Sequence, residues 1–150
     1  MFETEHEMSL RFEKYLKSNF GNTYLKEHPG LFGVPDFVFY AKQQKEISFI
    51  SFELKLKDWK RAAKQAFRYK SFSNIAYVVI GISSANAAMN NIDHFRKYNI
   101  GLASFDSNSY FEILFKPEIS EPYSENLKQK LVNTVARSRK KCRNIRILLG

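Results

Sequence analysis

Cysteine is nearly absent from this chain of 150 residues, which contains only Cys142. A single cysteine can form neither a disulfide within the chain nor a zinc site built from cysteines, so we expect it to serve packing. No apolar run reaches the roughly 18 residues that a membrane-spanning helix needs, and the charged first residues lack the apolar core of a signal peptide. These absences predict a soluble intracellular protein, cytoplasmic and without a membrane partner.

Several functional motifs are missing as well. His28 has no second histidine at a ligand spacing, which favours a loop residue over a metal ligand. The sequence has no zinc finger, no recognition-helix motif and no nucleotide-binding loop. It therefore gives no support to sequence-specific DNA reading or to ATP-dependent action.

Hydrophobic residues make up 44% of the chain and aromatic residues 15%, enough for one domain with one substantial core. We expect this domain to occupy residues 1–120, with a basic C-terminal helix and tail, residues 121–150, packed on it. The net charge is +9, and the excess is concentrated in residues 55–70 and 121–150. Such blocks favour binding to a polyanion, and nucleic acid is a better candidate than a membrane surface. The alternative is a basic surface that only aids solubility.

The hydrophobic periodicities predict an α/β fold in which helices flank a central mixed sheet. Residues 47–57 alternate as a central strand does, and residues 75–82 form a continuous apolar run typical of a buried strand. The predicted elements are, in chain order, a helix over 3–19, an edge strand over 22–27, strands over 34–41 and 47–57, a helix capped by Asp58, a strand over 75–82, a helix over 83–98, strands over 100–105 and 110–115, and a helix from Ser124 to about Lys141. This order is α-β-β-β-α-β-α-β-β followed by a basic C-terminal helix.

The polar turn at 42–46 predicts that residues 34–56 form an antiparallel hairpin. Such a hairpin places Asp36, at the start of one strand, near Glu53, at the end of the other. Glu53 and Lys55 project from the same face because strand side chains alternate. Considered alone, the strand is also consistent with a solvated polar face.

Two helices accompany this hairpin. On the first, Glu5 falls on the same stripe as the apolar Met8, so it is the carboxylate that this helix would offer to an interior site. The alternative is an exposed first-turn glutamate that favours the helix dipole. The helix after Asp58 carries a basic stripe at helical spacing, opposite a side that contains three alanines. The stripe consists of Lys57, Arg61, Lys64 and Arg68, with Gln65 near its edge.

With these residues in this order, the chain resembles the PD-(D/E)XK nuclease superfamily over residues 3–105. The resemblance rests on Pro35, Asp36, Glu53 and Lys55. In compact size, and in the acidic start of its first helix, Glu5-His6-Glu7-Met8, the chain is also similar to the archaeal Holliday junction resolvases. Gln65 and Tyr69 resemble the Gln-x-x-x-Tyr pair of RecB-type nucleases. The resemblance implies a restriction-endonuclease-like core.

Phosphodiester hydrolysis gives these residue types a chemical reason. The reaction needs a cation that neutralises the phosphate and makes a bound water acidic. Mg²⁺ prefers oxygen ligands, which Asp36 and Glu53 supply, and we expect Mn²⁺ to substitute. The resemblance further implies a ligand from the backbone carbonyl of Leu54, with Glu5 holding a metal or its water from the opposite side.

The resemblance also implies roles for the remaining polar residues. Lys55 would orient or help deprotonate the water, while Gln65 and Tyr69 would position substrate or water. Contacts to the DNA backbone, which position the substrate without reading bases, are expected from Lys57, Arg61, Lys64, Arg68, Tyr69, Arg137, Arg139, Lys140 and Lys141.

The expected function is thus a Mg²⁺-dependent endodeoxyribonuclease of a junction-resolving, repair or restriction-like kind. We expect a homodimer, because one chain carries one active site and duplex cutting needs two. The alternative is a catalytically inactive nucleic-acid-binding or assembly module that retains the nuclease fold.

Overall fold

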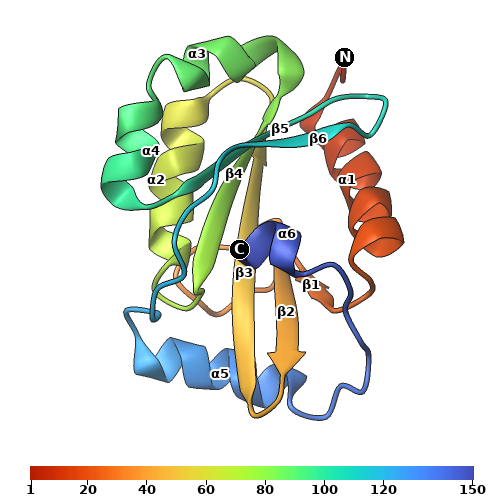
Figure 1. Ribbon diagram of the computed structural model, residues 1–150, viewed down its shortest axis with the longest axis vertical. Helices are drawn as coiled ribbons and strands as arrows, with labels where there is room; N and C mark the ends of the chain where they lie inside the picture. The colour runs from red at the N-terminus through yellow and green to blue at the C-terminus, as the bar shows by residue number, and fades with distance from the viewer.

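Six strands form one open mixed sheet in the spatial order β1-β2-β3-β4-β5-β6, and the computed structural model describes all 150 residues around it (Figure 1). The strands are β1 (Tyr24–Lys26), β2 (Phe37–Gln43), β3 (Glu46–Lys55), β4 (Ile75–Gly81), β5 (Gly101–Phe105) and β6 (Phe111–Phe115). Strand β2 is antiparallel to both of its neighbours, β1 and β3, while β3, β4 and β5 run parallel and β6 returns antiparallel to β5. The predicted α/β class with a mixed sheet is confirmed.

Helices cover both faces of this sheet (Figure 1). The helices are α1 (Glu5–Asn19), α2 (Trp59–Tyr69), α3 (Ala85–Met89), α4 (Ile92–Tyr98), α5 (Glu125–Val135) and α6 (Arg146–Leu149), with one 3-10 turn, η1 (Ile82–Ser84). The first and last helices pack on one face, and the other four helices pack on the opposite face. Both helices of the C-terminal part therefore pack on the same sheet as the rest of the chain. None of the helices is long and apolar enough to cross a bilayer.

The interior strand β3 divides its side chains between two cores, as its alternation predicted. Ile50, Phe52 and Leu54 belong to the core beneath α1, where the rings of Phe52 and Phe12 lie 5.3 Å apart. Glu53 belongs to the other face, which α2 covers. A burial pattern with period two on each face fixes the register of the strand, because a slip of one residue would exchange the two faces.

Helix α2 begins at the predicted cap, since the Asp58 carboxylate accepts a hydrogen bond from the Arg61 backbone N–H at 3.1 Å. Ala62, Ala63 and Ala66 are fully buried against the sheet. Their small side chains let the helix axis lie close to β3 and β4, while the basic side of the helix stays exposed.

Strand β2 starts three residues later than the predicted Val34. Pro35 has no N–H to give to a ladder, and the Val34 carbonyl is bound by a tyrosine hydroxyl instead of a strand. Asp36 therefore lies just before the strand, although its own N–H still donates to the Phe52 carbonyl at 3.1 Å. The prediction of an antiparallel hairpin is confirmed.

The helix predicted over 83–98 is interrupted. The segment begins with η1, and Asn90 and Asn91 separate α3 from α4. The Asn91 side chain donates to the Ala87 carbonyl at 2.9 Å, and such local bonds compete with the helical ladder.

The helix predicted from Ser124 to about Lys141 ends at Val135. The chain turns away because the Lys42 ammonium binds the carbonyl oxygens of Ala136 and Ser138. Further along, Arg143 binds carbonyls at the end of α1. The basic residues of this segment therefore lie beyond the helix, and favourable interaction with the α5 dipole does not explain them.

Candidate active site

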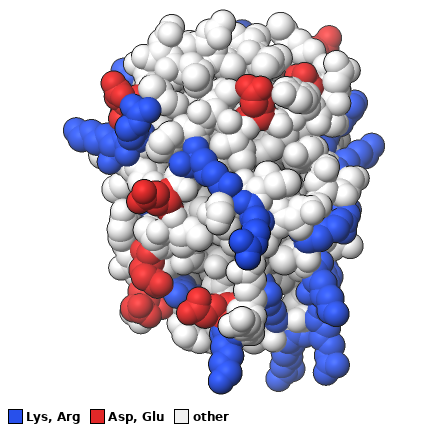
Figure 2. All heavy atoms as spheres, viewed as in Figure 1, with Lys and Arg blue, Asp and Glu red and all other residues white.

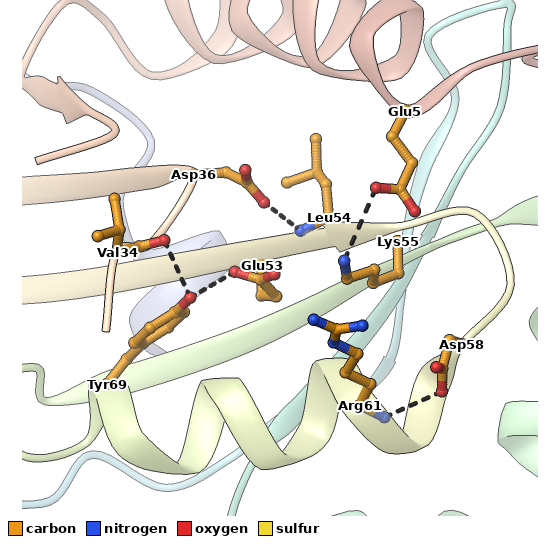
Figure 3. Close-up of polar contacts among 9 residues, drawn as sticks. All are labelled: Glu5, Val34, Asp36, Glu53, Leu54, Lys55, Asp58, Arg61 and Tyr69. Carbon is orange, nitrogen blue, oxygen red and sulfur yellow. Dashed lines mark hydrogen bonds and ion pairs between the residues drawn. The ribbon is translucent and has the colours of Figure 1, made fainter. Parts of the chain in front are cut away.

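The junction of β2 and β3 brings two carboxylates to one place (Figure 3). Phe37 pairs with Phe52 in the antiparallel register, so Asp36, one residue earlier, lies beside Glu53, one residue later. The turn between the two strands predicted this pairing, and the register confirms it. The two residues approach from different strands, and their position is fixed by backbone pairing rather than by side-chain contacts.

Asp36 is held by the strand opposite. Its Oδ2 accepts a hydrogen bond from the Leu54 backbone N–H at 2.8 Å. Burial raises the pKa of Asp36 to about 6, and the Leu54 N–H and the charge of Lys55 offset this only in part. The carboxylate is thus oriented at its site but poorly stabilised in its charged form.

Glu53 is more deeply placed, with 5% of its surface exposed. Its Oε1 accepts a hydrogen bond from the Tyr69 hydroxyl at 2.6 Å (Figure 3). Burial, followed by the nearby charge of Asp36, raises the pKa of Glu53 to about 7. Burial opposes the ionisation of both carboxylates, and Asp36 further opposes that of Glu53, so the site favours a cation.

Tyr69 connects this carboxylate to the loop before β2. Besides donating to Glu53, its hydroxyl lies 3.1 Å from the Val34 carbonyl oxygen. Gly33 has a φ of +82°, and a Cβ at that position would lie 2.9 Å from the Tyr69 ring. Only glycine suits this conformation and this close contact.

The position of Tyr69 changes its expected role. It is 1% exposed, so it supports Glu53 from below rather than contributing to an exposed DNA-binding stripe. The contribution of Gly33 and Val34 was not anticipated. The sequence signal for it was the alternation of proline and glycine directly before Asp36, at Pro29, Gly30, Gly33 and Pro35.

Lys55 lies at the same end of β3, where its ammonium is 3.7 Å from a carboxylate oxygen of Glu5 (Figure 3). The expectation that Glu5 is buried is wrong, because its side chain is 48% exposed in the first turn of α1. Its charge nevertheless reaches the site. Glu13, the other acidic residue of α1 near the apolar stripe, is instead bound by Tyr24 and Lys26.

Helix α2 contributes two further groups. Gln65 lies one turn before Tyr69 on the same side of the helix, and its Oε1 is buried without a hydrogen-bond partner in the protein. Arg61, one turn earlier again, extends its guanidinium from α2 toward β3 (Figure 3). A buried acceptor without a donor is costly, and a donor from a bound molecule would satisfy it.

The donor set for a metal is smaller than expected. No group of three or more His, Cys, Asp or Glu side chains is placed to hold a metal, so Glu5 does not complete a three-carboxylate cluster with Asp36 and Glu53. Two adjacent carboxylates still fit Mg²⁺, which commonly takes one or two carboxylates and completes its shell with water and substrate phosphate. The raised pKa values of Asp36 and Glu53 agree with such a fit, because a cation would stabilise both charged forms.

The two basic regions lie on different parts of the surface. The stripe on α2 borders a groove on the surface, lined by Asp58, Lys60, Arg61, Lys64, Gln65 and Arg68. On the face shown in Figure 2, Lys and Arg side chains also gather at the lower right, where Figure 1 places the segment between α5 and α6. That segment contains Arg137, Arg139, Lys140 and Lys141, none of which forms an ion pair.

Comparisons of the chain with protein-family models, with curated proteins and with solved structures gave no match. The functional argument therefore rests on the chemistry of the residues at the β2–β3 junction.

Proposed function

We propose that the chain is a metal-dependent nuclease that hydrolyses DNA phosphodiester bonds, with a restriction-endonuclease-like core. The observation that carries the proposal is the meeting of Asp36 and Glu53 at one end of the β2–β3 pair, with Lys55 on the same end of β3. The order of elements from α1 to β4 is the one that the hydrophobic periodicities predicted.

Each residue at the junction has a distinct role in this proposal. Asp36 and Glu53 would hold the cation, together with the backbone carbonyl of Leu54. When bound, a Mg²⁺ ion supplies charge neutralisation of the phosphate and a more acidic water. Tyr69 fixes the orientation of Glu53 through its 2.6 Å hydrogen bond.

Lys55 provides a positive charge that lowers the pKa of both carboxylates, against the effect of burial. Its ion pair with Glu5 is partly exposed, and exchange of such a pair for another anion costs little. The ammonium would then turn toward an attacking water or a developing negative charge on the phosphate. Glu5 in this proposal holds Lys55 in place before substrate binds.

The substrate would run along the exposed side of α2. Lys57, Arg61, Lys64 and Arg68 offer a row of cations to successive phosphates, and Gln65 Oε1 offers an acceptor to a donor of the water or substrate. Backbone contacts of this kind give affinity without sequence preference. Cleavage of both duplex strands would need two copies of the site, so we expect a dimer when duplex DNA is cut.

The test is cleavage of supercoiled plasmid and of branched DNA with Mg²⁺, Mn²⁺ or EDTA. We expect wild type to cut with either metal, and Asp36→Asn, Glu53→Gln and Lys55→Met to lose activity. Glu13→Gln and Lys26→Met provide matched controls, because they remove a similar ion pair, between α1 and β1, away from the site. Cleavage that persists in the three site variants overturns the assignment.

The same experiment separates the proposal from an inactive binding module. A module of that kind would bind DNA in a salt-sensitive way and show no metal-dependent cleavage in wild type. The size of the protein in solution, measured with and without duplex DNA, tests the dimer.

A further inference from the structure

The loop before β2, residues 28–34, presents apolar side chains to solvent beside the carboxylates. The residue exposure is 50% for Phe32 and 52% for Val34. Val34 is two residues from Asp36, so the exposed surface directly borders the proposed site. Apolar surface of this kind is a common feature of binding sites when the segment that carries it is held in place.

This loop is held at several points. On one side, the Lys130 ammonium of α5 donates to the Gly30 carbonyl at 3.0 Å. On the other side, Val34 and Gly33 contact Tyr69 of α2, as described above. Phe32 lies between these contacts, so the backbone that exposes its side chain is held on both sides.

Phe32 has a cationic neighbour. The guanidinium carbon of Arg68 lies 5.5 Å from the centre of the Phe32 ring, a cation–π contact. Arg68 also belongs to the basic stripe that would follow the phosphates. An aromatic ring and a guanidinium plane are the two kinds of side chain on which nucleobases stack.

We propose that Phe32 and Arg68 form a binding site for an unpaired nucleobase next to the bond that is cut. The inference rests on the proposed function and narrows its substrate class to nucleic acid with an unpaired base at the site, such as a single strand or a fork. In an intact duplex the faces of the bases are covered by their neighbours, so a ring at the loop tip has no base face to contact. A single strand offers a base face at every nucleotide.

Binding can be measured separately from cleavage. In EDTA, fluorescence anisotropy would follow labelled single-strand, forked and duplex DNA of one sequence, and the same single strand as RNA. Phe32→Ala should weaken binding of the single strands and the fork by about 5- to 150-fold, the effect of losing one stacked base. Duplex binding should change less than about twofold, and Phe32→Trp should retain the preference.

Tyr110→Ala is the matched control, because Tyr110 is an aromatic residue with 58% exposure on the β5–β6 turn. It should leave all substrates unchanged. Equal weakening of every substrate by Phe32→Ala, or no weakening, overturns the base-binding site. The proposed nuclease function would survive the loss of the base-binding site if wild type cuts DNA with Mg²⁺ and Glu53→Gln does not. If wild type neither binds nor cuts DNA, the nuclease function and the base-binding site are both wrong.

Discussion

The two basic regions of the molecule carry the same charge but differ in what surrounds it. Residues 55–70 contain seven Lys and Arg against one Asp, and residues 121–150 contain eight against two Glu, so each has a net charge of +6. The first region borders the buried carboxylates Asp36 and Glu53. The segment after α5 has no carboxylate partner within ion-pair distance of its four cations. By charge alone the two regions are equivalent candidates for binding phosphates, and the adjoining carboxylates distinguish the first region as the proposed reactive surface.

The regions also differ in how they are held. The α2 stripe stands on a regular helix that is capped by Asp58 and packed by alanines. The segment after α5 has no regular structure, and it is fixed by Arg143 and Asn144, which donate to carbonyls at the end of α1. Both surfaces are thus anchored, but of the two only α2 packs directly on β3, the strand that carries Glu53 and Lys55.

The largest expected effect separates catalysis from binding. Lys55→Met should lower kcat by about 10²- to 10⁴-fold, the usual range for removal of a group that assists proton transfer or charge stabilisation, with DNA affinity nearly unchanged. The double variant Arg139→Met, Lys140→Met should instead weaken binding by about tenfold and leave kcat unchanged. Single-turnover cleavage at saturating enzyme measures the first effect, and anisotropy measures the second. An equal loss of kcat in the double variant would contradict the comparison.

Stability at high pH should reveal the cost of the carboxylate pair. The pKa of Glu53 is raised from 4.5 to about 7 in the folded protein, so folding favours the protonated form. Its contribution to the free energy of unfolding is present below about pH 4.5 and is lost as the pH rises through 7. In EDTA at pH 8, Glu53→Gln should therefore stabilise the protein by on the order of 2 to 3 kcal/mol, with a small effect at pH 5.

Urea unfolding at the two pH values measures this effect, and Glu13→Gln provides a control of opposite sign. The pKa of Glu13 is lowered, chiefly by its hydrogen bond from Tyr24, so its stabilising contribution is present at high pH and lost in acid. That variant should be less stable than wild type at pH 8. Added Mg²⁺ should stabilise wild type and not Glu53→Gln, because only a ligand of the folded state shifts unfolding.

A smaller effect is expected from the support beneath Glu53. Tyr69→Phe removes the 2.6 Å hydrogen bond to Glu53. Because this bond stabilises the charged carboxylate, its loss should raise the pKa of Glu53 and lower kcat by about tenfold. The pH–rate profile should shift upward. Tyr24→Phe removes a bond of the same length to Glu13 and should leave activity unchanged. An unshifted profile in Tyr69→Phe would show that the bond has only a structural role.

The smallest effect concerns salt and should be alike in the two regions. We consider removal of two cations proposed to contact phosphates, either Lys57 just before α2 with Lys64 on α2, or Arg139 with Lys140 in the segment after α5. Either removal should reduce the slope of log affinity against log salt. The reduction should be about 1.8 for duplex DNA in either case. Affinity measured between about 50 and 200 mM salt provides the slope. If the slope changes for only one of the two pairs of variants, DNA does not contact the other basic region.

Much of the site could be predicted because it depends on local patterns. The alternation in β3 placed Glu53 on the face opposite Phe52, and the turn before it placed Asp36 at the same end of the hairpin. The cap at Asp58 fixed where α2 begins. Each of these follows from a period or a backbone preference within a few residues, so the sequence carries the information directly.

Other features depended on contacts between distant residues. The end of α5 is set by Lys42, and the division near Asn91 depends on a single side-chain bond, neither of which changes the hydrophobic period. The exposure of Glu5 follows from where α1 begins relative to β3. Helical spacing describes which side a residue faces, but it does not tell how far the neighbouring sheet extends.

The sequence by itself determined the α/β order, the pairing of Asp36 with Glu53 and the basic side of α2, because these arise from periodicity and turns. Only the tertiary structure decided that Tyr69 supports Glu53, that Glu5 pairs with Lys55 while Glu13 is bound elsewhere, and that Phe32 is held exposed beside the site. These contacts join separate elements. Their geometry depends on how α1, α2 and the loop before β2 pack against one sheet, which no local pattern specifies.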